Sequence, residues 1–325
     1  MFLKNKRYIE RPPDGTPVMH YLNIYQLLSM LYRQSICFSS VTIYEDILES
    51  TLSKPSYKEV LSHPLWEDNT PVKKDKYYCS RQEHFRNDSP GLIYHPPEAE
   101  WENETFSNLI HNLSRHFMYI HCWSTANEEN ILMWDRYRHQ GSSVAIKTTI
   151  NQIKKAFVCA EPLHIGKIQY KDYDTEHITG FKNYGKKNLL DPDTVEELFY
   201  QPIFHKQNIY KSENEVRIVI DFRYMTDIHL KTMCLSEIPF YDKNWGLSEK
   251  RHPQWEEDCV YFRTSSNNYV GVPNTWWVKV NLDQLIEHII LSPYVASYTK
   301  EGIRGVLHKY SIDPNKVIES SIELG

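Results

Sequence analysis

Hydrophobic and polar positions alternate along this chain with two periods, one typical of strands and the other of helices. Residues 18–24 and 35–40 have the short apolar runs of strands. Between them, four apolar residues follow the i, i+3, i+4, i+7 spacing of one helix face: Ile24, Leu27, Leu28 and Leu31. The chain is therefore predicted to open with a strand, a helix and a second strand.

The same alternation continues through the middle of the chain. Helices are predicted over 101–117, 127–139 and 150–158, and strands over 118–124, 142–149 and 163–170. Asn127, followed by two glutamates, has the composition of a helix start, because a side-chain acceptor and early carboxylates suit the free N–H groups there. Thr149 with Gln152 forms a capping-box pattern for the next helix.

The last third of the chain is predicted to be less regular. Residues 171–212 are predicted to be mainly helical, with a helix start at Asp191-Pro192 and an interruption at Pro202. Strands are then predicted over 215–222, 275–281, 289–294 and 316–321, and helices over 282–289 and 298–310. This order predicts an α+β fold with a mixed, largely antiparallel sheet and packed helices.

The domain organisation follows from length and from two polar stretches. With 325 residues and 41% hydrophobic content, the chain can bury the core of a single domain over 1–325. Residues 51–100 and 223–275 lack a clear period; the first is predicted to be an insertion or a mobile loop, and the second an insertion.

Composition narrows the classes of function. A net charge of −5 argues against wholesale wrapping of nucleic acid, although a local basic face remains compatible with it. The chain has 11 glycines and lacks the glycine-rich phosphate loops, so a bound nucleotide requires another device. Six widely spaced cysteines, no apolar leader and no long apolar run indicate a reduced, cytoplasmic protein without a membrane segment.

The candidate chemistry centres on two carboxylates at the mouth of the strand that follows residue 212. Glu213 and Glu215 lie at i and i+2, so a strand period of 2 places both on one face, with Arg217 two residues further on. An ordinary cross-strand ion pair between Glu215 and Arg217 at the edge of the sheet explains these charges as well as catalysis does.

The chain resembles a bacterial family of unknown function. The resemblance is carried by a Phe-Cys-Leu-Ser-like strand, a Met-Trp…Tyr helix and a Glu-x-Glu-x-Arg strand, which stand here as His121-Cys122-Trp123-Ser124, Met133-Trp134 with Tyr137, and Glu213-Asn214-Glu215-Val216-Arg217. It covers 19–50 and 115–325. An Asn-Asp-Pro-Phe-Glu-like turn of the family is replaced by Tyr44-Glu45-Asp46, and Ser292 stands where glycine is usual. The resemblance supports the fold and leaves the reaction open.

The chain also resembles ADP-ribosyltransferases, in His20-Tyr21, then Trp123-Ser124-Thr125, then Glu213-x-Glu215. This resemblance implies an NAD-consuming effector of a bacterial toxin or phage-defence system. Glu215 would stabilise the ribose cation, Glu213 would act as general base, and Ser124 would brace Glu215 or the ribose. A cofactor-binding group of His20, Tyr21, Thr125, Trp134, Tyr137 and Arg217 would hold NAD. The hypothesis requires Glu215, Ser124 and His20 to meet in one pocket.

One alternative remains open, and another is disfavoured. A non-catalytic module could hold a nucleotide or a nucleic-acid base by stacking in an aromatic cleft, with Lys73, Lys74 and Lys76 as an electrostatic contact. Met133, Trp134 and Tyr137 are, however, at a spacing more typical of core than of a ligand box. A metal-dependent reaction is disfavoured, because the chain has no H-x-x-x-H or H-E-x-x-H pattern. The acceptor substrate is not encoded in any motif.

Overall fold

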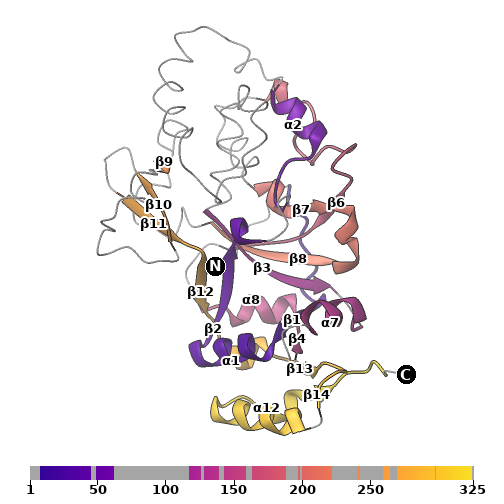
Figure 1. Ribbon diagram of the computed structural model, residues 1–325, viewed down its shortest axis with the longest axis vertical. Helices are drawn as coiled ribbons and strands as arrows, with labels where there is room; N and C mark the ends of the chain where they lie inside the picture. Colours follow the sequence, from indigo (N-terminus) through magenta and orange to yellow (C-terminus); the bar gives the residue numbers. More distant parts are fainter. Residues whose placement is uncertain are drawn as a thin grey trace.

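The protein was analysed as a computed structural model (Figure 1). The structure describes residues 8–44, 49–61, 117–125, 128–138, 143–158, 163–187, 197, 200–221, 240–241, 259–263, 269–296 and 298–323. The predicted helix over 101–116, Asp191-Pro192, and most of 51–100 and 223–275 lie outside these residues.

A nine-stranded mixed sheet organises the described residues, and most of its pairings are antiparallel. Its main path is β12-β2-β3-β1-β4-β13-β14, and β8 joins β3 to β5. The strands are β1 (Pro17–Asn23), β2 (Ser35–Ser40), β3 (Met118–Thr125), β4 (Ser143–Thr149), β5 (Leu163–Lys167), β8 (Glu215–Asp221), β12 (Thr275–Lys279), β13 (His288–Leu291) and β14 (Val317–Glu319). Only β13 and β14 pair in parallel within this sheet as described. The predicted α+β class and sheet type are confirmed.

One edge of β3 is shared by two strands, so the sheet forks there. β2 pairs with β3 at Ile120 and Tyr119, whereas β1 pairs with it at Thr125 and Ser124. β8 pairs along the whole opposite edge of β3. The fork leaves the backbone of 121–123 without a ladder partner on that edge, a gap that side chains fill.

The two faces of the sheet bury different sets of side chains. On the first face, Val18, Trp123 and Ile218 belong to the main hydrophobic core. The second face carries two hydrophobic clusters. One includes Ile120 and Val219, and the other holds Met19, Tyr21, Trp134, Ala145 and Ile290. Since strand residues alternate between faces, neighbours in sequence enter different clusters.

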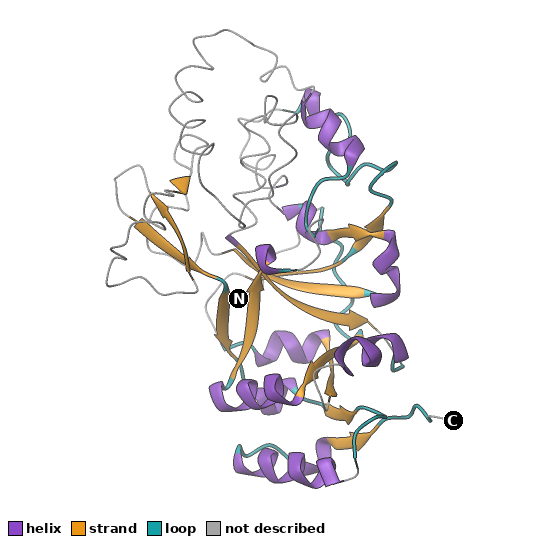
Figure 2. Cartoon of the chain, in the orientation of Figure 1, coloured by secondary structure: helices purple, strands orange, loops and turns teal. Residues whose placement is uncertain are grey.

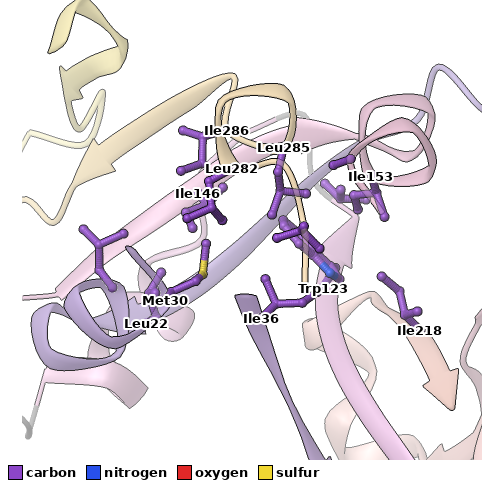
Figure 3. Packing of buried hydrophobic residues seen from close by; sticks show 14 of the residues in the cluster. Leu22, Met30, Ile36, Trp123, Ile146, Ile153, Ile218, Leu282, Leu285 and Ile286 are labelled. Atoms are coloured by element: carbon purple, nitrogen blue, oxygen red, sulfur yellow. The ribbon is translucent and has the colours of Figure 1, made fainter. Parts of the chain in front are cut away.

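Four helices cover the first face: α1 (Ile24–Arg33), α8 (Ile150–Ala156), α11 (Leu282–Leu285) and α12 (Tyr298–Lys309). Figure 3 shows Trp123 of β3 amid this packing, with Ile36 of β2 and Ile153 of α8 among the surrounding residues. The second face is covered by α7 (Ile131–Arg138), by the 3₁₀ helix η5 (Pro202–Phe204) and by Ile9. Figure 2 shows this distribution of helices about the strands.

Local hydrogen bonds explain where the helices begin. At α1, the Asn23 side chain accepts from the Gln26 backbone N–H and the Gln26 side chain accepts from the Asn23 N–H, a complete capping box. The predicted start of the later helix at Asn127 is wrong, since α7 begins at Ile131 and the Asn130 side chain caps it by accepting from the Leu132 N–H. The predicted Thr149 cap of α8 is confirmed by its bond from the Gln152 N–H.

The prediction that 171–212 is mainly helical is wrong for the described residues. They form 3₁₀ helices η4 (Tyr184–Lys186), η5 and η6 (Asn208–Glu213), together with the short strand β7 (His205–Gln207), which pairs in parallel with β6 (Gln169–Lys171). Pro202 opens η5, because proline suits the first position of a helix and cannot continue an earlier one. These short elements bring Lys206 and Glu213 to the mouth of β8.

The remaining described elements are α2 (Lys54–Leu61), the 3₁₀ helices η1 (Val41–Ile43) and η10 (Pro314–Lys316), and a three-stranded sheet of β9 (Phe240–Tyr241), β10 (Cys259–Arg263) and β11 (Tyr269–Pro273). None of the helices in the described ranges has the length and apolarity that crossing a bilayer requires.

Candidate functional site

Glu213 and Glu215 meet at one lysine, through a turn rather than through strand alternation. Glu213 is the last residue of η6, Asn214 adopts the left-handed conformation with φ 44°, and Glu215 begins β8. The Lys206 Nζ lies 2.7 Å from Glu213 Oε2 and 3.2 Å from Glu215 Oε2. The predicted convergence of the two carboxylates is therefore present, but its cause is the Asn214 turn, which asparagine tolerates better than most residues.

Arg217 and Glu49 extend this pair into a buried ion network. The Arg217 Nε donates to Glu215 Oε1 at 2.5 Å, and its Nη2 lies 2.7 Å from Glu49 Oε1. Glu49 also lies 3.4 Å from Lys206. Arg217 is 0% exposed on a strand between β3 and β5, so the predicted pair of Glu215 and Arg217 is real but lies inside the sheet rather than at its edge.

The network alternates in charge, and this alternation keeps Glu215 and Lys206 ionised. Burial alone would raise the pKa of Glu215, but Arg217 and Lys206 hold it well below its ordinary value. Burial alone would lower the pKa of Lys206, and Glu215, Glu49 and Glu213 raise it instead. Both oxygens of Glu215 accept from cations, so this carboxylate is fully engaged.

The network reaches solvent at Arg136 of α7. The Arg136 guanidinium pairs with Glu213, and its side chain is 57% exposed, against 11% for Glu213. Burial lowers and Glu213 raises the pKa of Arg136, with a net increase. Glu213 is thus held between a buried lysine and an exposed arginine that come from two different elements.

Hydroxyl and thiol groups line the network on the second face of the sheet. The Tyr170 hydroxyl accepts from the Glu215 backbone N–H at 2.8 Å, and the Tyr44 hydroxyl lies 3.9 Å from the Cys122 sulfur. Burial, followed by the Glu215 carboxylate, raises the pKa of Cys122 well above its ordinary value, so this thiol stays protonated. Burial raises the pKa of Tyr137 to about 12.

Ser124 and Thr125 hold the turn that carries the carboxylates, not the carboxylates themselves. The Ser124 hydroxyl donates to the Glu213 backbone carbonyl at 2.6 Å, and the Thr125 hydroxyl and backbone N–H donate to the Asn214 carbonyl at 2.9 and 2.8 Å. The expected bracing of the Glu215 carboxylate by Ser124 is absent from the described contacts. The structure instead gives both residues a role in fixing backbone.

His20 lies on the opposite face of the sheet from Glu215, so the expected meeting of these residues does not occur. Met19 is paired with Ser124, which is paired with Glu215, and these three share the second face. The His20 Nδ1–H donates to the Cys122 carbonyl at 2.8 Å inside the fork of β3, and its ring lies 4.3 Å from that of His121. His20 therefore satisfies backbone left unpaired by the fork.

The aromatic candidates divide between core and site. Tyr21 and Trp134 are buried, with their rings 4.8 Å apart and edge to face, and the Trp134 Nε1 donates to Glu129. Neither presents a ring to a ligand. Tyr137 is half-buried, stacks on Tyr21 at 6.3 Å, and lies close enough to Glu213 and Glu215 for their charges to affect its pKa. Of the three, Tyr137 alone borders the network.

Several residues of this site could not be identified as functional candidates from the sequence pattern. Glu49 stands beside a stretch predicted to be an insertion, and Lys206 lies in a short strand without apolar alternation. Arg136 directly precedes Tyr137 on the recognised aromatic helix, which is the nearest clue to it. Lys73, Lys74 and Lys76, expected to contact nucleic acid, lie outside the described residues.

The side chains of the site can be compared with what a metal ion or NAD would require. Among the described side chains, no three His, Cys, Asp or Glu residues are grouped as a metal site. For NAD consumption, the carboxylate expected to stabilise the ribose is neutralised by two cations, and His20 faces the other way. The expected catalytic arrangement therefore does not fit these residues as they stand. Comparisons of the chain with protein-family models, with curated proteins and with solved structures found no match.

Proposed function

We propose that this protein binds a nucleotide at the exposed end of the ion network, with a phosphate group held by Arg136 and Lys206. The observation that carries the proposal is that these two cations, from α7 and β7, converge on one carboxylate near the surface. Arginine supplies a fork of donors that suits phosphate oxygens, and lysine adds a compact charge. The pair has the donor chemistry of a phosphate site.

Tyrosines beside these cations support a nucleotide rather than a bare anion. The Lys206 Nζ lies 4.7 Å from the centre of the Tyr210 ring, and Tyr137 and Tyr170 are half-buried next to the carboxylates. Tyrosine rings offer flat apolar faces for a base together with a hydroxyl for a ribose. Trp134, buried in the core, has no part in this proposal.

The state of Glu215 favours binding over turnover. A carboxylate that stabilises a developing cation must present a free oxygen to it. Both oxygens of Glu215 accept hydrogen bonds from Arg217 or Lys206, and its side chain is 5% exposed. Burying this many charges is unfavourable unless they are paired. This explains why the charges of the network are paired with one another even without a ligand.

The proposal is tested by measuring the melting temperature with NAD, ADP and inorganic phosphate. We expect NAD or ADP to raise it in the wild type, and the Arg136→Gln variant to lose the increase while melting close to the wild-type temperature without ligand. Arg304→Gln is a matched control, because Arg304 forms a surface pair with Glu301 on α12. Equal stabilisation of the Arg136 variant by the nucleotides would refute the proposal.

A second candidate is an NAD-consuming, ADP-ribosyltransferase-like effector. It is favoured by the convergence of Glu213 and Glu215 on Lys206, beside the turn held by Ser124 and Thr125. It requires Lys206 or Arg217 to release an oxygen of Glu215 when ligand binds. Slow nicotinamide release from NAD that Glu215→Gln abolishes, with folding intact by circular dichroism, would favour this candidate. Unchanged release in that variant would exclude Glu215 as its reacting carboxylate.

A further inference from the structure

We infer that the Glu213 carboxylate is an internal stand-in for the phosphate of the ligand, so that the free protein holds its own site closed. This inference rests on the proposed nucleotide-binding function and concerns the regulation of that site. The Glu213 carboxylate pairs with Arg136 and lies 2.7 Å from Lys206. These are the two cations to which the phosphate is assigned, so carboxylate and phosphate compete for one position.

Glu213 is the carboxylate of the network that can leave with the least disturbance. Glu49 and Glu215 both pair with the buried Arg217 and are 2% and 5% exposed. Glu213 makes no contact with Arg217 in the described structure and lies nearest to the exposed Arg136. When Glu213 turns away, Lys206 keeps its partners Glu49 and Glu215, so no buried lysine is left unpaired.

Only the side chain of Glu213 has to move. Its backbone carbonyl accepts from the Ser124 hydroxyl, and the next carbonyl, that of Asn214, accepts from the Thr125 hydroxyl and N–H. The preceding carbonyl, of Ser212, accepts from the Asn130 side chain. Three consecutive carbonyls are thus anchored, and rotation about the Glu213 side-chain bonds opens the site without rebuilding the turn.

Charge balance identifies the class of anion that fits. Three carboxylates, of Glu49, Glu213 and Glu215, face three cations, of Arg136, Lys206 and Arg217, which gives 3 − 3 = 0 net charge. Removal of the Glu213 charge from the cluster leaves a net charge of +1. A phosphodiester or one charged unit of a diphosphate restores neutrality, so a nucleoside diphosphate or a dinucleotide matches the opened site.

The test compares ADP binding by the wild type, Glu213→Gln and Glu301→Gln, measured by calorimetry at fixed salt. We expect Glu213→Gln to bind ADP about tenfold more tightly than the wild type. This change in affinity lies within the usual range for two groups, here the Glu213 carboxylate and the phosphate, whose binding is coupled. Glu301→Gln, which removes the partner of Arg304 on α12, should leave the affinity unchanged. Glu213→Asp, whose shorter carboxylate cannot span both cations, should also bind more tightly and serves if the glutamine variant does not fold.

The outcomes separate this inference from the proposed function. If the wild type binds ADP and the folded Glu213 variants bind it equally or less tightly, the stand-in role is refuted and the nucleotide site survives. If neither the wild type nor the folded Glu213 variants bind ADP, both are refuted. Tighter binding by Glu213→Gln that disappears in the Glu213→Gln, Arg136→Gln double variant supports both.

Discussion

The Ser124 hydroxyl donates a 2.6 Å hydrogen bond to the backbone carbonyl of Glu213, 89 residues further along the chain. Ser124 is buried on β3, opposite Glu215 of β8. Ser124, which the sequence suggested as a ligand-binding serine, thus fixes the backbone of the turn that carries Glu213 and Glu215. Its effect on any ligand is transmitted through the position of Glu213.

Ser124→Ala is expected to lower the free energy of unfolding by about 1–3 kcal/mol, because the Glu213 carbonyl loses its buried donor. It should also tighten ADP binding, since an unanchored turn holds the competing Glu213 carboxylate less firmly between Arg136 and Lys206. Ser35→Ala is the matched control, because the Ser35 hydroxyl donates to the Arg33 carbonyl at 2.8 Å, away from the site. Urea unfolding and calorimetry measure the two effects. Equal ADP affinities of the two variants would contradict the assignment.

Arg217→Met is expected to lower the free energy of unfolding by about 3–5 kcal/mol, because Glu49 and Glu215 lose their shared buried cation. Lys300→Met removes an ion pair with Glu319, whose side chain is 72% exposed. For this surface pair the expected loss is below about 1 kcal/mol. Urea unfolding of both variants checks the contrast. Losses of equal size would mean that the network contributes no more than an ordinary surface pair.

Stability is expected to fall as pH decreases from about 6.5 to about 4. Burial lowers the pKa of His20 to about 4, and burial with the nearby His20 lowers that of His121 well below its ordinary value. The unfolded chain therefore binds more protons in this window, so acid favours unfolding by about 1.4 kcal/mol per pH unit for each histidine. Above pH 6.5 both are neutral and the stability is fully present.

Urea unfolding at pH 7, 6 and 5 measures this slope, and the His20→Gln variant should reduce it by removing one titrating group. The His121 and Trp123 rings beside His20 provide no negative charge to offset a proton on His20. A slope that is the same in the variant and the wild type would assign the acid sensitivity to other groups.

Glu129→Ala is expected to release the end of the chain from α7. The Glu129 carboxylate accepts from the Trp134 Nε1, from the Ser320 hydroxyl, and from the backbone N–H and hydroxyl of Ser321. Loss of these bonds should accelerate amide exchange over 317–323 while exchange in β8 stays unchanged. The adjacent Glu128→Ala is the control. Protection that persists at Ser321 in the Glu129 variant would contradict this anchoring role.

The strands were predictable from sequence where both faces of a strand are buried. β3, β4 and β8 are buried along most of their length because they lie in the interior of the sheet, and their apolar residues predicted them. The prediction for 171–212 failed at residues such as 205–207, which pair with β6 as a strand although the composition there is compatible with a helix. Local propensity is a weak guide where tertiary contacts decide.

The candidate site was predictable only where its residues are close in sequence, at Glu213, Glu215 and Arg217. Glu213 and Glu215 are close in sequence, so their meeting required no long-range knowledge. Lys206 and Glu49 reach them through the fold, from segments with no local pattern that marks them. The prediction that His20 lies beside Glu215 was wrong for a related reason. The order of motifs along a chain carries no information about the face of the sheet on which each side chain lies.

The left-handed Asn214 has a consequence for substitutions at the middle position of the Glu-x-Glu motif. A β-branched residue there would resist a φ of 44° and straighten the chain, carrying Glu213 away from Lys206 even though both glutamates are retained. Glycine would preserve the bend. In homologous chains, the character of that central residue is thus a better indicator of a joined acidic pair than the two glutamates by themselves.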